Sequence, residues 1–197
     1  MIVTKVSTDF FELRRPDLPW GDYGDILAHG MADYRGDKQW ALDRTGPYVP
    51  PISQPSNKVV VNAEFRQLLE KSGLTGLDFA PVILGRVPEI DWLSWEPYGP
   101  KSMKYPAGNE PENYILRRKH SAKAAAAIGT LWELQLSEGI TAHRLDRYRL
   151  DPASWTGADF FLVRGERASG NYVSKKARDW LTGMAGEWVA FGPVHIL

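Results

Sequence analysis

The residue types that most often bind metals or act in catalysis are present in this sequence, but they are scattered. Its four histidines stand alone at positions 29, 120, 143 and 195. None belongs to an HxH, HxxxH or HExxH pair, the spacings that bring two imidazoles to one metal ion. The chain also has no cysteine, which excludes thiolate metal sites, thiol nucleophiles and disulfides. The sequence therefore predicts no metal site and no cofactor.

Motifs for phosphate binding or hydrolysis are also missing from the sequence. It contains no GxxxxGK[ST] phosphate loop, no GxGxxG after a strand and no GxSxG elbow. The glycine and aspartate cluster GDYGD at residues 21–25 is typical of a turn, with metal or sugar binding as the alternative. We therefore predict no catalytic residues and expect that the protein is not an enzyme. The alternative is an enzyme of unassigned type, with a polar cleft between two lobes that uses His120, His143 or the Asp22 and Asp25 pair.

Basic side chains concentrate in two stretches. Residues 117–120 read RRKH, with Lys123 close by, and predict either a contact for an acidic partner or phosphate, or a solvated strand end. Residues 143–151 interleave arginine with aspartate, as on a charged surface strand. Over the whole chain, 24 Lys and Arg balance 24 Asp and Glu, so no net field attracts nucleic acid or anionic lipid. We expect no general nucleic-acid binding.

Targeting and membrane signals are not visible in the sequence. Residues 1–20 contain charges throughout and lack the unbroken apolar core of a signal peptide. The longest run of small apolar residues, 124–128, is far below the ~20 residues that a membrane span needs. We therefore expect a cytoplasmic protein with no membrane partner.

The segment from residue 88 to 111 is rich in proline, glycine and aromatic residues and predicts a long irregular loop. Such a loop in a compact domain is usually functional or disordered, and its aromatic side chains argue against disorder. The rings either cover the protein's own core or act as anchors of a protein interface. On the second interpretation, the partner-binding residues are Trp92, Trp95, Tyr98 and Tyr105.

A strand-helix-strand pattern at about residues 59–84 recurs at about 171–197, with a shift of 112 positions. Asn62 in the first copy can cap the helix that follows, and Ser174 takes the same place in the second. Besides this pair, six matched positions are identical, namely Val61, Arg66, Leu69, Phe79, Pro81 and Val82 of the first copy. The recurrence reflects either a duplication or convergence on one supersecondary element.

The remaining elements mix helices and strands without regular alternation, which predicts an α+β fold with mixed sheets. We expect strands at 2–6, 114–118, 131–136 and 160–164, and a helix at 122–128 capped by Ser121. The four prolines in residues 43–57 predict an irregular connection. With 197 residues, the chain is expected to form a single domain, 1–197, whose two similar halves are joined by the 88–111 loop.

The C-terminal copy resembles the C-terminal pattern of immunity proteins from bacterial polymorphic-toxin systems. The similarity lies in Asp159–Val163, the Val-Ser pair at 173–174, Leu181, and Val189–Val194. It is greatest to the double-CxxCG immunity proteins and their cysteine-free relatives. The segment from Val61 to Val82 looks like an earlier copy of the same pattern.

This resemblance implies a small cytoplasmic bacterial protein that binds a cognate toxin and neutralises it by direct contact. Such a protein covers the active site of the toxin or another essential surface. Because this chain lacks both CxxC pairs, no zinc role of the relatives is implied for it. The family offers no catalytic residue to carry over. A structural homodimer that uses the aromatic loop is a third alternative.

Overall fold

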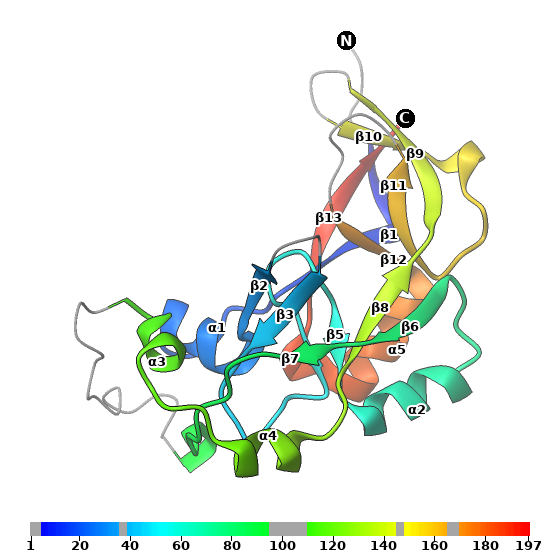
Figure 1. Cartoon of the computed structure of the whole chain (residues 1–197). Helices are drawn as coiled ribbons and strands as arrows, with labels where there is room; N and C mark the ends of the chain where they lie inside the picture. Colours follow the sequence, from blue (N-terminus) through cyan, green and yellow to red (C-terminus); the bar gives the residue numbers. More distant parts are fainter. Residues whose placement is uncertain (1–4, 36–38, 95–109, 145–147, 165–169) are drawn as a thin grey trace. The chain divides into compact units, whose positions relative to one another are not determined.

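The computed structural model describes residues 5–35, 39–94, 110–144, 148–164 and 170–197 (Figure 1). Helices and mixed sheets are both present, so the predicted α+β class is confirmed. The chain divides into two compact units built from interleaved segments. The first unit comprises residues 1–16, 67–80 and 134–197, and the second comprises residues 17–66 and 81–133. A single domain with two similar halves stays a prediction.

The first unit contains a closed β-barrel. Its strands are β1 (Lys5–Arg14), β9 (Glu138–Arg144), β10 (Tyr148–Asp151), β11 (Phe160–Arg164), β12 (Asn171–Ser174) and β13 (Ala190–Ile196). Around the barrel they follow the order β1-β12-β11-β9-β10-β13. The β9–β11 and β10–β13 pairs are parallel, and the other neighbours are antiparallel. Strands that are far apart in the sequence therefore lie side by side.

The interior of the barrel is a packed apolar core. Phe10 meets Phe161 edge to face, with ring centroids 5.9 Å apart, and meets Trp155 at 5.1 Å. Strand β9 approaches so closely that a Cβ on Gly139 would lie 2.4 Å from the Cβ of Phe161, which requires glycine there. The residues that fill this core are Phe10, Ile140, Leu150, Phe161, Val163, Val194 and Ile196.

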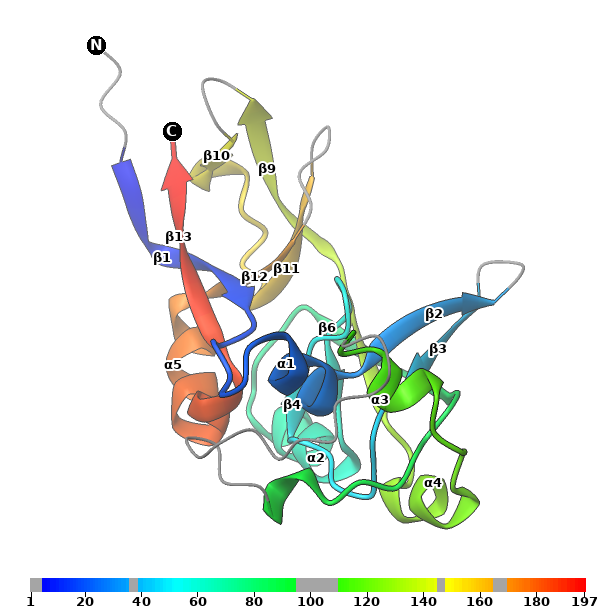
Figure 2. The ribbon, with the colours of Figure 1, turned by 90° about the vertical axis from the view of Figure 1, so that its left-hand side faces the viewer.

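Helix α5 (Lys175–Ala185) connects β12 to β13 through the short helix η3 (Gly186–Trp188). The hydroxyl of Ser174 caps α5 by accepting from the backbone N–H of Ala177 at 3.2 Å. The helix buries Ala177, Leu181 and Ala185 and packs beside β1 and β12 (Figure 2). The apolar spacing of this segment therefore places one helical face against the barrel.

The second unit begins with α1 (Asp22–His29) and the antiparallel hairpin of β2 (Met31–Arg35) and β3 (Gln39–Asp43). Strand β7 (Ile83–Leu84) pairs in parallel with β3. A separate sheet has the order β4-β5-β8-β6, formed by β4 (Ile52–Ser53), β5 (Val60–Val61), β8 (Trp132–Leu136) and β6 (Leu77–Pro81).

One apolar cluster of the second unit is formed by Leu42, Val60 and Leu131. Beside it lies the carboxylate of Glu133, which is buried but has two partners. It accepts from the indole N–H of Trp40 at 2.9 Å and pairs with the Lys58 ammonium at 2.7 Å. These bonds satisfy a charge whose burial would otherwise be costly.

The described residues contain three further α-helices, α2 (Ala63–Lys71), α3 (Asn113–Leu116) and α4 (Ala122–Ile128). They also contain the short 3₁₀ helices η1 (Trp92–Ser94) and η2 (Pro152–Ser154). The predicted caps are confirmed, because Asn62 Oδ1 accepts from Phe65 N at 2.8 Å and Ser121 Oγ accepts from Ala124 N at 3.2 Å. In the described part of the chain, no helix is long and apolar enough to cross a membrane.

Several predicted elements need correction. The first strand reaches Arg14, well beyond residue 6. Residues 114–118 were expected as a strand because of their branched and aromatic side chains, but α3 ends at Leu116 and a turn follows. Burial of Tyr114 and Ile115 on adjacent positions of one helical turn outweighs that β preference.

The final strand of the strand-helix-strand pattern at about residues 59–84 is broken into β6 and β7. Pro81 has no N–H for a ladder, and the N–H of Val82 donates instead to the carbonyl of Leu131 at 2.9 Å. The strand-helix-strand repeat is not confirmed as a structural unit. Its element order recurs, but β12 and β13 both pair with β1, whereas β5 pairs with β4 and β8.

Candidate functional site

The aromatic residues predicted to bind a partner are only partly described. Trp92 lies in η1, is 9% exposed, and packs edge to face against Tyr48 with ring centroids 5.2 Å apart. This position matches the alternative in which the loop covers the core of the second unit. Trp95, Tyr98 and Tyr105 fall outside the described residues, so their role as anchors stays a prediction.

The histidines occupy separate positions. His29 is fully buried in α1, and His120 is exposed, with its Nδ1 accepting from the backbone N–H of Val87 at 3.1 Å. His143 is exposed at the end of β9, and His195 is half-buried in β13. The structure shows no group of three or more His, Asp or Glu side chains arranged for a metal ion in the part of the chain that it describes.

The GDYGD cluster is the start of a helix and not an isolated turn. Asp22 and Asp25 lie in the first turn of α1, where negative charge interacts favourably with the helix dipole. Gly24 packs so tightly that a Cβ there would lie 2.1 Å from the carbonyl oxygen of Pro19. The glycine and the two acids therefore serve the helix start, which their spacing could have indicated.

Arg44, directly after β3, is a fully buried arginine that the sequence pattern did not reveal. Burial lowers the pKa of its guanidinium to about 10, and the charge interaction with Tyr48 opposes this shift. The Nη2 group donates to the Ala28 carbonyl at 3.3 Å, and the neighbouring Thr45 hydroxyl donates to the Leu27 carbonyl at 3.1 Å. Because these are the last carbonyls of α1, Arg44 acts as a cationic cap at the helix C-terminus.

The carboxylate of Asp159 accepts hydrogen bonds from several parts of the first unit. Its side chain is 8% exposed and sits directly before β11. Oδ1 accepts from the Ser174 hydroxyl at 2.7 Å. Oδ2 accepts from the Thr75 backbone N–H at 3.1 Å and from the Lys176 ammonium at 3.1 Å. One carboxylate thus joins three segments of the first unit.

The environment of Asp159 favours its charged form. Burial alone would raise the pKa, but the hydrogen bonds from Ser174, Lys176 and Thr75 outweigh burial and lower the pKa of the carboxyl below its ordinary value of 3.8. A carboxylate held ionised by several donors is a poor general base or acid at neutral pH. We therefore assign Asp159 a structural role in fixing β11, β12 and the start of α5.

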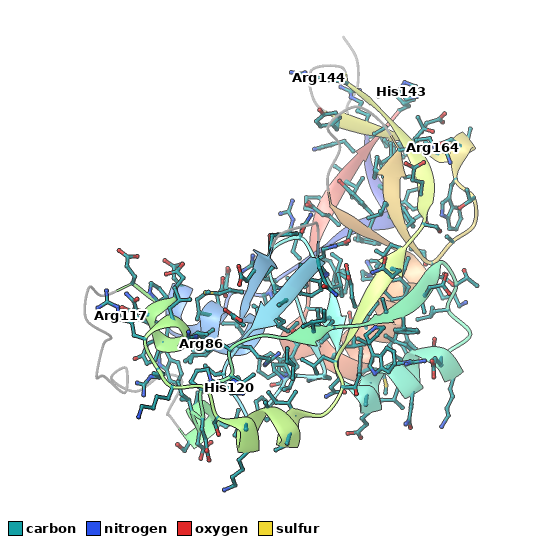
Figure 3. All side chains as sticks on the ribbon, viewed as in Figure 1. Arg86, Arg117, His120, His143, Arg144 and Arg164 are labelled. Carbon is teal, nitrogen blue, oxygen red and sulfur yellow. The ribbon has the colours of Figure 1, made fainter. Side chains whose placement is uncertain are left out.

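The RRKH stretch lies on the surface of the second unit, in the turn between α3 and α4. Figure 3 labels Arg86, Arg117 and His120, which lie on the same side of that unit. The Nη1 group of Arg86 donates to the carbonyl of Arg118 at 3.1 Å, which places a cation distant in sequence beside this turn. We call the exposed cations Arg86, Arg117, Arg118, Lys119 and Lys123 the basic surface.

A second group of basic residues lies at the end of the barrel. His143 and Arg144 are exposed on β9, while Arg164 on β11 pairs with Glu138 at 2.8 Å (Figure 3). Arg149, expected on a charged surface strand, is instead 2% exposed in β10. The interleaved charges of residues 143–151 therefore do not form a uniform surface row. The basic surface of the second unit is the stronger candidate for a site.

Comparison with known proteins gives no further identification. The chain matches no protein-family model, no curated protein and no solved structure. The resemblance to immunity proteins therefore rests on the matched residues of the sequence alone. The candidate contact region rests on the geometry of the basic surface.

Proposed function

We propose that this chain is an immunity-type binding protein that neutralises a cognate bacterial toxin by direct contact in the cytoplasm. The proposal gives the chain no catalytic role, no cofactor and no membrane partner. Its partner is the toxic domain of a co-inherited polymorphic toxin. The protein would protect the cell by covering a surface that the toxin needs for its activity.

The observation that carries the proposal is the bond between two parts of the family-like pattern. Asp159 opens the first motif and Ser174 belongs to the second, and the two side chains are joined at 2.7 Å. The same hydroxyl caps α5, which carries the third matched position, Leu181, with its side chain fully buried. The matched residues therefore lie in contact within one folded unit, so the resemblance covers a packed element of this chain.

We further propose that the two strand-helix-strand segments arose by duplication. Each cap accepts a hydrogen bond from the backbone N–H three residues later. Asn62 accepts from Phe65 and Ser174 accepts from Ala177, so the two bonds join equivalent positions of the two segments. Arg66 lies 3.7 Å from the ring centroid of Trp132, and its counterpart Arg178 lies 4.2 Å from that of Phe11. The two arginines thus make the same kind of contact, although Trp132 lies in β8 and Phe11 in β1.

Co-expression tests the proposed function. The toxic C-terminal domain encoded by the neighbouring gene is induced in a bacterial host with and without this chain. We expect this chain to restore growth and to co-purify with the toxic domain as a complex. The matched control is a toxic domain from an unrelated system, against which no protection is expected. Continued killing by the cognate domain, with the chain present in soluble form and no complex, would refute the proposal.

A further inference from the structure

The basic surface concentrates positive charge without internal compensation. Its members are Arg86, Arg117, Arg118, Lys119 and Lys123, and none of them forms an ion pair within the described ranges. Adjacent like charges repel one another, so this arrangement costs some stability unless an acidic partner neutralises it.

The three arginines of the basic surface each contact other groups of the second unit. Arg117 Nε donates to Asn113 Oδ1 at 2.9 Å, and the Arg118 guanidinium lies 5.4 Å from the ring centroid of Tyr114. Arg86 donates to the Arg118 carbonyl at 3.1 Å. Since their geometry is already set, these side chains would lose less conformational entropy on binding than free surface arginines.

The backbone below the basic surface is anchored in the core of the second unit. The N–H of Val87 donates to His120 Nδ1 at 3.1 Å, and the N–H of Ser121 donates to the Val87 carbonyl at 2.7 Å. Tyr114 and Val87 are almost completely buried. The segments around residues 86 and 120 therefore form one rigid platform.

The surroundings of these cations favour a protein partner over a nucleic acid. Leu116, next to Arg117, leaves 48% of its surface exposed, which suits the apolar centre of a protein interface. The chain as a whole has a formal net charge of zero, which provides no long-range attraction to nucleic acid.

We propose that the basic surface is the docking site for an acidic face of the cognate toxin. This inference rests on the proposed function and specifies the contact surface. Carboxylates of the toxin would pair with Arg117 and Lys119, and its apolar side chains would cover Leu116. Arginine is well suited to this role because its planar guanidinium binds carboxylates with two parallel hydrogen bonds.

Charge reversal at the centre of the surface tests the inference. Arg117→Glu with Lys119→Glu is compared with the control variant Lys71→Glu with Arg144→Glu, which changes the formal charge equally at exposed sites of the first unit. Affinity for the purified toxic domain is measured by calorimetry at low and high salt, with circular dichroism as a check on folding. We expect the test variant to bind at least about 30-fold more weakly and the control to stay within about twofold.

The outcomes separate the two proposals. If the wild-type chain does not bind the toxic domain, the proposed function fails and this inference fails with it. If the wild type binds and the folded test variant binds equally well, only the docking site is wrong. Equal losses in the test and control variants would also overturn it, because net charge and not position would then matter. Partial recovery by an Asp or Glu→Lys variant of the toxin would support it.

Nucleic acid is examined in the same series. A labelled RNA or DNA oligonucleotide is titrated with the wild type and with the test variant. We expect the wild type to bind the oligonucleotide no more tightly than the control variant Lys71→Glu with Arg144→Glu does. Salt-sensitive oligonucleotide binding that disappears in the test variant, with toxin affinity unchanged, would overturn the inference and reassign the surface to nucleic acid.

Discussion

The two strand-helix-strand segments share their local structure but differ in what surrounds them. In each, a polar side chain caps the helix, an arginine stacks on an aromatic ring, and a leucine at the matched position is almost completely buried. The strands of the C-terminal segment, β12 and β13, both belong to the closed barrel. The first segment instead has β5 in a separate sheet and a final strand broken at Val82.

The caps also differ in their second partners. Ser174 both accepts from Ala177 and donates to the buried carboxylate of Asp159. The carboxamide oxygen of Asn62 accepts from Phe65 N at the equivalent position. The comparison teaches that short-range hydrogen bonds can form the same capped helix in both segments. The strands around each helix then decide which sheet the segment joins. The following predictions test how far the equivalence extends.

Removing the matched leucines should have the largest effect. We expect Leu69→Ala and Leu181→Ala each to lower the free energy of unfolding by about 3 kcal/mol, because each leaves a cavity at an almost fully buried position. Urea denaturation followed by circular dichroism measures this. Leu68→Ala, at a side chain 37% exposed, is the control and should cost below about 1 kcal/mol. A large cost at Leu181 with almost none at Leu69 would end the structural equivalence of the two helices.

Asp159→Asn should remove the buried negative charge that Ser174 and Lys176 contact in the C-terminal segment. We expect a loss of about 2 kcal/mol at neutral pH, because Ser174 and Lys176 lose their charged acceptor. The pKa of Asp159 is lowered in the folded state, so its stabilisation is present above the ordinary value of 3.8 and is lost as the pH falls below that value. The stability difference between wild type and variant should therefore shrink below about pH 4.

The control for this pH profile is Asp179→Asn. That carboxyl also has a lowered pKa, through hydrogen bonds from Lys175 and Arg178, but it is exposed. We expect it to leave the acid limb of the stability curve nearly unchanged. If Asp159→Asn lowers the free energy of unfolding by the same amount at pH 3 and at pH 7, the role of the charged carboxylate is contradicted.

The helix caps provide a smaller and more direct comparison. Asn62→Ala should cost about 1 kcal/mol, the usual contribution of a side-chain cap. Ser174→Ala should cost about 1 kcal/mol more, because it also removes the hydroxyl donor to Asp159. Ser174→Thr keeps a hydroxyl and should recover most of the loss. Equal costs at the two caps, measured by urea denaturation, would show that the Asp159 bond adds nothing.

The stacked arginines should show the smallest effects. Arg66→Ala and Arg178→Ala are each expected to cost about 0.5–1 kcal/mol, with the larger value at Arg66 because an indole binds a cation more strongly than a phenyl ring. The Arg66→Lys and Arg178→Lys variants retain the charge and should lose less. The opposite ranking in thermal denaturation would show that packing of the side-chain stems, and not the cation–π contact, decides these values.

Local elements could be predicted where short-range signals are strong. Asn62, Ser121 and Ser174 each precede a helix and each proves to be its cap. The α1 helix was missed although Asp22 and Asp25 lie in its first turn, because Gly24 stands in the same turn and glycine has a low helix propensity. The residues 114–118 were assigned to a strand because side-chain type alone does not reveal which positions become buried together.

The candidate site could be predicted only in part. The RRKH stretch was recognisable as a basic cluster, but Arg86 joins it across 32 positions through a hydrogen bond to Arg118. Arg149 appeared to be a surface residue and is buried instead. The donors to Asp159 are Thr75, Ser174 and Lys176. Their spacing in the sequence does not indicate that they meet at one carboxylate.

The sequence by itself determined the helix caps, because a cap is a contact between residues three positions apart, and it also indicated the α+β class and the strand at 160–164. Only the tertiary structure decided the barrel order, the parallel pairing of β9 with β11, and the gathering of Arg86 with Arg117 and Lys119. These features depend on contacts between segments that are distant in the chain. Such contacts are stabilised by burial and hydrogen bonds whose partners cannot be read from the order of residue types.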